Sequence, residues 1–232
     1  MRTPIGIDLM AEQRYLYIVF LSTPYRTGSF IRAVTRFPYN HMGISLSPKF
    51  RYFYSFSRHY KAAPFYGGFT KESILRYRYN GKTATMKICA VPVSEENYQE
   101  AKKRLEFLES HSEAFVYNML SAMCFPFRIN VRVDRSYTCA EFVLSMLRKY
   151  SDIPVLKECK FCSIKEACEI LEPYKIFEGS AGAYLKNADW FGDTFPEEMG
   201  TWFYTKKTFY NNGRLAYRFV KGKLNKKRGT SL

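Results

Sequence analysis

The sequence predicts an α+β fold in which an antiparallel sheet packs against a helix that carries a cysteine at its start. Strand-like and helix-like segments are mixed without the strict alternation of a doubly wound parallel sheet. Two strand-like runs are separated by the turn pair Ser47–Pro48, which indicates an antiparallel hairpin. Further on, the pattern Thr-x-x-Glu precedes an amphipathic run and marks the start of a helix.

The first half of the chain contains most of the predicted sheet. Short apolar runs bounded by turn residues indicate strands over residues 15–21, 41–46, 50–57 and 84–93. Apolar residues recur at helical spacing between the first two strands, so a helix capped by Thr27 or Ser29 is expected to end at Pro38. The stretch "APFYGGF" is rich in glycine, proline and aromatic residues and is interpreted as a loop.

The second half of the chain is predicted to be mainly helical. Capping residues and apolar spacing indicate helices over residues 94–108, 113–124, 139–150 and 163–171. The segment "FRINVRV" is interpreted as a short strand or an extended linker. Weaker patterns indicate strands near residues 202–209 and 214–220.

Composition bounds the class of protein. No apolar run approaches the roughly 20 residues that a membrane-spanning helix needs, and no signal peptide is evident near the start. The six cysteines are irregularly spaced, which is typical of a reducing compartment. We therefore expect a cytoplasmic protein. The pair Cys159–Cys162 lacks a second pair of ligands, so neither a metal nor a cofactor is expected.

The net charge of +15 is concentrated at one end of the chain. Residues 201–232 contain nine Lys or Arg and no Asp or Glu. This distribution predicts one domain over residues 1–186 and a basic extension over residues 187–232. Such an extension suggests an anionic partner, namely nucleic acid, an acidic lipid surface or a wall polymer, although a solvated tail is an equal alternative. No nucleic-acid-binding motif is recognisable.

The cysteine at position 139 is a candidate nucleophile. Thr138 and Glu141 form a capping-box pattern, which places Cys139 at the first position of the helix. A thiol there is close to unpaired amides and to the positive end of the helix dipole, which favour the reactive thiolate. The chain has three histidines, and His41 is the best base because it opens an apolar strand, whereas His59 and His111 lie in polar stretches.

Three segments in order resemble a known superfamily. The stretch "IRAVTRFPYNHMGISL", the later "YTCAEFV" and the final "IFEGSAGAY" resemble the circularly permuted NlpC-type papain-like proteins, which include the YiiX-like cysteine hydrolases and are similar to lecithin:retinol acyltransferase. In this group the histidine strand precedes the cysteine helix, as it does here. The resemblance covers roughly residues 15–184 and implies a permuted papain-like fold.

The resemblance also implies roles for individual residues. Cys139 would be the nucleophile and His41 the general base. The third member is expected on the strand after the histidine, where Ser55 is the best candidate, followed by Ser57 and Tyr54. That strand offers no carboxylate or amide, so we expect a weaker base than a carboxylate would give.

Two functions are therefore expected from the sequence. The first is a cysteine hydrolase or acyltransferase that forms a thioester, with the oxyanion bound by the amide of Cys139 and by Tyr137. Its substrate would be a peptide, a cell-wall amide or a lipid ester. The second is a catalytically weak or inactive binding module on the same fold, which would hold an anionic partner through the basic extension.

Overall fold

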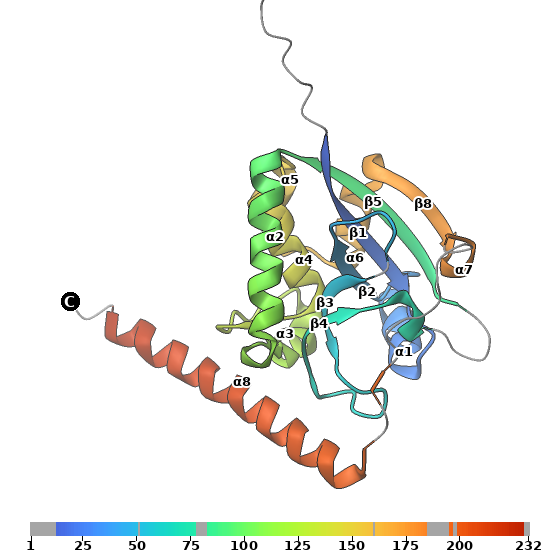
Figure 1. The fold of residues 1–232 in the computed structure, drawn as a ribbon. Helices are drawn as coiled ribbons and strands as arrows, with labels where there is room; N and C mark the ends of the chain where they lie inside the picture. Colours follow the sequence, from blue (N-terminus) through green and yellow to red (C-terminus); the bar gives the residue numbers. More distant parts are fainter. Residues whose placement is uncertain are drawn as a thin grey trace, which may run out of the picture.

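A computed structural model describes residues 13–50, 52–77, 83–159, 161–184, 195–196 and 199–229. Six strands of this part of the chain form one sheet, in which every neighbouring pair is antiparallel (Figure 1). The strands are β1 Arg14–Ser22, β2 His41–Ser45, β3 Phe53–Arg58, β4 Gly67–Glu72, β5 Thr85–Val93 and β8 Lys175–Ser180. Their order is β4-β3-β2-β1-β5-β8. The α+β class with an antiparallel sheet is thus confirmed.

The sheet buries apolar side chains on both faces. Along β1, Leu16, Ile18 and Phe20 belong to one core cluster, whereas Val19 and Leu21 belong to another. This alternation follows from the pleat of a strand, in which successive side chains point to opposite faces. Because β1 is central and covered on both sides, its sequence reads as a continuous apolar run rather than an alternating one.

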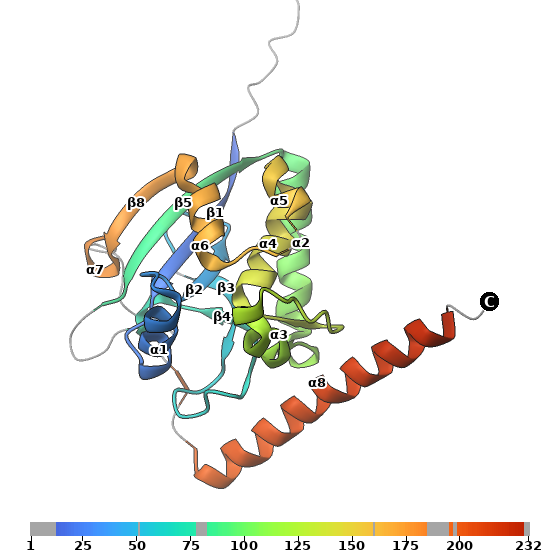
Figure 2. The same cartoon turned by 180° about the vertical axis from the view of Figure 1, so that it is seen from behind.

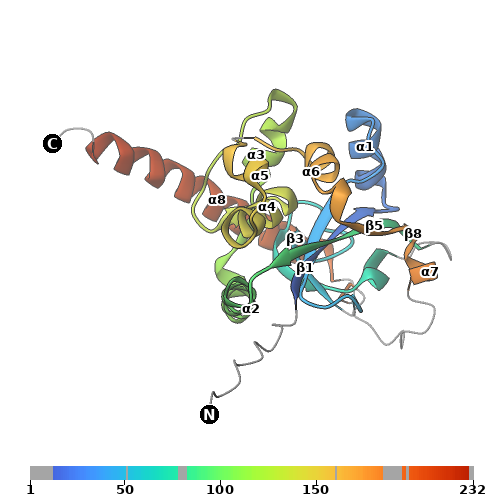
Figure 3. The same ribbon diagram turned by 90° about the horizontal axis from the view of Figure 1, so that it is seen from above.

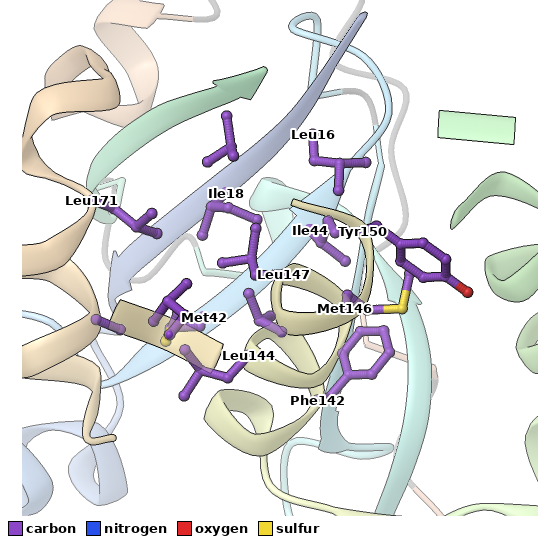
Figure 4. Close-up of a cluster of buried hydrophobic side chains, with 14 of the residues drawn as sticks. Leu16, Ile18, Met42, Ile44, Phe142, Leu144, Met146, Leu147, Tyr150 and Leu171 are labelled. Carbon is purple, nitrogen blue, oxygen red and sulfur yellow. The ribbon is translucent and has the colours of Figure 1, made fainter. Parts of the chain in front are cut away.

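Helix α4, Cys139–Tyr150, covers one face of the sheet and packs against β2 and β3. Its buried side chains interdigitate with those of the strands, as Figure 4 shows for Leu144 and Leu147 beside Met42 and Ile44. Each such side chain contributes on the order of 1.5–3 kcal/mol when fully buried. The predicted packing of the cysteine helix on the sheet that contains the His41 strand is confirmed.

The other α-helices within residues 13–184 surround α4 and the ends of the sheet. They are α1 Arg26–Thr35, α2 Glu95–Ser110, α3 Met119–Cys124, α5 Pro154–Glu158, α6 Ile164–Ile170 and α7 Ala181–Tyr184. Seen from above, α4, α5 and α6 gather on one side of the sheet (Figure 3). Ser94 and Ser163 cap α2 and α6 as predicted, but α1 follows Tyr25 without a side-chain cap.

Two segments differ from the sequence interpretation. Residues 113–124 do not form one helix, because Val116–Tyr117 is a strand, β6, that pairs in parallel with β7, Ser136–Tyr137. The end of "APFYGGF" is not a loop but the start of β4. A Cβ on Gly68 would lie 2.4 Å from the carbonyl oxygen of Phe115, so this glycine permits close packing of two backbones within a strand.

The hairpin between β2 and β3 has another register than a turn centred at Ser47–Pro48 would give. Ile44 lies opposite Tyr54, and the connection runs from Leu46 to Tyr52 rather than turning tightly at Ser47–Pro48. Phe50 within it has a φ of 45° and buries its ring completely. Compared with a tight turn at Ser47–Pro48, the longer connection with its buried Phe50 ring places the partner of each β2 residue further along β3.

The C-terminal extension forms a long helix, α8 Thr201–Gly229, so the two predicted strands near residues 202–209 and 214–220 were wrong. Figures 1 and 2 show α8 crossing beside the sheet domain and projecting beyond it. Leu215 is buried against Val116 and Val133, and the Asn211 amide donates to the carbonyl oxygen of Gly67 at 2.6 Å. The aromatic residues that favour a strand locally are overridden by this docking of one helix face. Within the described ranges, α8 included, no helix is long and apolar enough to cross a membrane.

Candidate active site

A complete capping box fixes the start of α4. The Thr138 hydroxyl accepts from the amide of Glu141 at 3.2 Å, and the Glu141 carboxylate accepts from the amide of Thr138 at 2.7 Å. Cys139 is therefore the first helical residue, as the sequence predicts. Its amide is one of the first four of the helix, which have no partner within the helix itself.

A second set of hydrogen bonds holds Glu141, and with it the start of α4. The Ser121 hydroxyl donates to Glu141, and the Asn118 amide lies 3.4 Å from the same carboxylate. The backbone of Asn118 donates to the carbonyl oxygen of Tyr137 at 2.9 Å. The short β6–β7 pair therefore anchors the two residues that lead into Cys139, and the thiol is positioned from both sides of the helix start.

His41 joins this thiol to a buried carboxylate. It is the first residue of β2, is 7% exposed, and its Nε2 lies 2.7 Å from Oε1 of Glu72. The Cys139 side chain also acts on the pKa of the imidazole, through hydrogen bonding and charge, so the thiol lies close to the ring. Since Glu72 takes Nε2, the ring nitrogen left for Cys139 is Nδ1. The starts of β2 and α4 thus meet through the His41 imidazole.

Glu72, at the end of β4, is fully buried and is surrounded by donors. Besides His41, it accepts from the hydroxyl of Tyr77 at 2.6 Å, from Ser57 at 3.2 Å and from Ser55. The Arg76 guanidinium lies 4.0 Å away. A buried carboxylate that receives several hydrogen bonds and faces cations stays ionised despite its burial.

The charged forms of His41 and Glu72 stabilise each other. Burial alone lowers the pKa of His41, but the Glu72 carboxylate and the interaction with Cys139 outweigh it and raise that pKa to about 10. Burial likewise raises the pKa of Glu72, but the opposing effects of His41, Arg76 and Ser55 dominate and lower it to about 2. At neutral pH the pair is therefore an imidazolium and a carboxylate, which places a positive charge beside the Cys139 thiol.

The structure puts a carboxylate where the sequence predicted a serine. Ser55 donates its hydroxyl to Glu72, so it orients the acid rather than the imidazole, and Ser57 does the same. Tyr54 lies elsewhere and bonds to Glu109 at 3.0 Å. β3 itself has no carboxylate, as expected. Glu72 comes instead from the next strand, β4, where it lies opposite Phe53 of β3. Glu72 could have been predicted as a partner of His41 if Gly67–Glu72 had been identified as a strand.

Two tyrosines precede and flank the thiol on the β6–β7 pair. Tyr137, the predicted oxyanion donor, has its ring packed 5.2 Å from Phe56 and in contact with Phe142. Its register partner Tyr117 was not predicted, yet burial followed by the charge of Cys139 raises its pKa. A phenol that stays protonated close to the nucleophile is a hydrogen-bond donor, so Tyr117 is a further candidate for this role.

The other cysteines and histidines have different surroundings. Burial raises the pKa of the Cys89 and Cys162 thiols to about 12 in each case, which keeps them protonated and inert. His111 is exposed and stacks on Phe107 at the end of α2, as expected for a solvated residue. His59 is half-buried rather than exposed, and burial followed by Arg76 lowers its pKa to about 4.

The described residues offer no group of three His, Cys, Asp or Glu side chains that would hold a metal ion. Compared with known proteins, the chain matches no family model, no curated protein and no solved structure. The chemistry of Cys139, His41 and Glu72 is therefore the basis on which a function can be proposed.

Proposed function

We propose that the protein is a cysteine-dependent hydrolase or acyltransferase with Cys139 as nucleophile, His41 as general acid and base, and Glu72 as the residue that orients and charges His41. The observation that carries the proposal is the 2.7 Å bond between Nε2 of His41 and the buried Glu72 carboxylate, on an imidazole that also interacts with Cys139. A nucleophile, a base and a third group that holds the base are the elements of covalent acyl transfer.

The first half of the reaction forms a thioester. The Cys139 thiolate attacks the carbonyl carbon, and the carbonyl oxygen becomes an oxyanion that the Cys139 amide stabilises together with the hydroxyl of Tyr137 or Tyr117. The tetrahedral intermediate then breaks its bond to the leaving nitrogen or oxygen. The His41 imidazolium gives its proton to that leaving group, and Glu72 keeps the ring aligned.

The second half regenerates the enzyme. The neutral His41 takes a proton from water or from an alcohol or amine acceptor, which attacks the thioester carbonyl. The carbon–sulfur bond breaks, the acyl group leaves on the acceptor, and the imidazolium and thiolate are restored. Hydrolysis and transfer differ only in the acceptor, and the resemblance to permuted NlpC-type proteins favours peptide, cell-wall amide or lipid-ester substrates.

The alternative of a weak or inactive binding module loses its main argument. A strand after His41 without a carboxylate or amide favours such a module, but Glu72 supplies a carboxylate from β4. The burial of Cys139 and His41, each 7% exposed, fits a site that excludes water around the reacting atoms.

Acylation and alkylation of the full chain test the proposal. A short p-nitrophenyl ester should release p-nitrophenol in a burst and leave one acyl group on Cys139, visible by intact-mass and peptide mass spectrometry and removed by hydroxylamine. With limiting iodoacetamide near neutral pH, Cys139 should be the first cysteine modified, because its neighbour is an imidazolium.

Matched variants distinguish a thiol that reacts because it is activated from one that reacts because it is exposed to solvent. Cys124 and Cys159 are more exposed than Cys139, so a reaction that follows exposure alone would modify them first. Cys139→Ala should abolish the burst, His41→Ala should reduce it at least about 100-fold, and Cys124→Ala should leave it unchanged. Modification of Cys124 or Cys159 while Cys139 stays free would contradict the proposal.

A further inference from the structure

Helix α8 carries a row of exposed apolar side chains on the side that faces away from the sheet domain. We call this row the apolar stripe, and it consists of Trp202, Phe209, Tyr210, Tyr217, Val220 and Leu224. Between 53% and 79% of each of these side chains is exposed. Contiguous apolar surface of this kind is rare on a protein that has no partner for it.

The stripe lies opposite the face by which α8 docks. Positions 209, 217, 220 and 224 are one or two helical turns apart and so share a side of the helix. The docked residues Asn211 and Leu215 each stand two positions from a member of the stripe, about 200° round the helix. The docking of α8 therefore turns the stripe outward, along a helix that projects beyond the domain (Figure 1).

Basic side chains border the stripe. The Arg214 guanidinium lies 5.5 Å from the ring centre of Tyr210, and the Lys221 ammonium lies 5.8 Å from that of Tyr217. Arg214, Tyr217, Arg218 and Lys221 also line a hollow of about 590 Å³, in which Asp134 is the only acidic lining residue. Burial, and after it the neighbouring Arg214, lowers the pKa of Arg218, and the Asp134 carboxylate acts against this shift.

From this arrangement we infer that α8 docks the protein on an anionic lipid surface, with the apolar stripe inserted at the level of the headgroups. Aromatic and aliphatic residues on one side of a helix and Lys or Arg along its border are the chemistry of an interfacial helix. The hollow beside Tyr217 takes a headgroup phosphate. This inference does not depend on the reaction at Cys139.

Two other occupants fit the same face less well. Nucleic acid would match the cations and stack on the aromatic rings, but Val220 and Leu224 offer nothing for bases to stack on. A second copy of the chain would bring two segments together that each carry nine positive and no negative charges in residues 201–232. The lipid surface alone uses both the aliphatic and the cationic parts.

Binding to vesicles tests the inference. The full chain with Trp190→Phe keeps Trp202 as its only tryptophan. Its emission should shift to the blue with phosphatidylcholine vesicles that contain phosphatidylserine, and much less with phosphatidylcholine alone. The shift should reverse at a few hundred millimolar salt, because the electrostatic part is screened over about 10 Å at 0.1 M.

Variants of exposed residues measure the apolar and the electrostatic contributions to vesicle binding separately. Replacing Phe209, Val220 and Leu224 by serine should lower the partition coefficient about 10- to 100-fold on sedimentation with acidic vesicles, from the loss of partial burial of three apolar side chains. Replacing Lys207 and Lys221 by alanine should lower it about 30-fold, and only for acidic vesicles. The matched control replaces Met123, Phe127 and Ile129, which are equally exposed elsewhere, and should bind as the parent does.

These experiments also have outcomes that would contradict the docking of α8 on a lipid surface. Equal partitioning of the parent and the Phe209, Val220 and Leu224 variant would overturn the inference. So would salt-sensitive binding of a single-stranded RNA without vesicle binding, or a dimer that this variant abolishes in light scattering. Because Cys139→Ala should bind vesicles as the parent does, failure here is distinguishable from failure of the proposed chemistry.

Discussion

The substitution Glu72→Gln tests whether the buried ion pair with His41 contributes to stability as well as to the site. The carboxylate has no exposed surface and joins His41, Tyr77 and two serines. Removing one partner of a buried pair costs about 3–5 kcal/mol, and the amide of glutamine keeps some of the hydrogen bonds. We therefore expect a loss of about 3 kcal/mol in the free energy of unfolding near pH 6.

The loss should depend on pH with a definite sign. The pKa of Glu72 is lowered to about 2, so its contribution is complete above about 4.5 and disappears as the pH falls toward 2. The pKa of His41 is raised to about 10, so its contribution is complete below about 6.5 and disappears as the pH rises through 10. The parent and the variant should therefore differ most between about pH 4.5 and 6.5 and least near pH 10.

Guanidinium unfolding followed by circular dichroism at pH 6 and pH 9.5 measures both effects. The control is Glu109→Gln, which removes a half-exposed carboxylate from Lys71 and Tyr54 and should cost no more than about 1 kcal/mol at either pH. A loss below about 1 kcal/mol for Glu72→Gln at pH 6, or an equal loss at both values, would refute the assignment of a charged pair.

Three further changes test the elements that position the site. Thr138→Ala removes one half of the capping box with Glu141 and should cost about 1 kcal/mol, seen as a melting temperature lower by about 2–4 °C; an unchanged melting temperature would argue against the cap. Gly43→Ala places a Cβ 2.2 Å from the buried ring of Phe53 and should cost about 1–3 kcal/mol in denaturant unfolding, whereas a neutral effect would mean that the ring moves freely. Leu215→Ala should speed amide exchange in α8 while the sheet stays protected, and uniform exchange would show that α8 does not dock through this residue.

Local signals predicted the half of the site that local interactions build. The Thr138–Glu141 pattern located the start of α4 to the residue, because a capping box is closed within one helical turn. The apolar face from Phe142 to Tyr150 likewise identified the side that covers the sheet. The strand that begins at His41 was also found from its apolar run and the turn residues that follow it.

The other half of the site depends on tertiary contacts that no local sequence pattern predicts. Glu72 reaches His41 only because β4 pairs with β3, and the two glycines that begin β4 made that strand look like a loop. Those glycines serve close backbone packing, which needs the partner strand in place to be recognised. For α8, the aromatic residues favour strands locally, but tertiary contacts such as those of Leu215 and Asn211 stabilise the helix instead.

The nucleophile comes late in the chain, and this has a consequence for the order of synthesis. His41 and Glu72 lie on β2 and β4, on either side of β3, and both precede Cys139 in the order of synthesis. Cys139 follows only after β5 and α2 have been made, and its helix must close over the sheet before the thiol meets the imidazole. A nascent or truncated chain that stops before α4 therefore carries His41 and Glu72 without Cys139, so the proposed acyl chemistry would begin only with the folded domain.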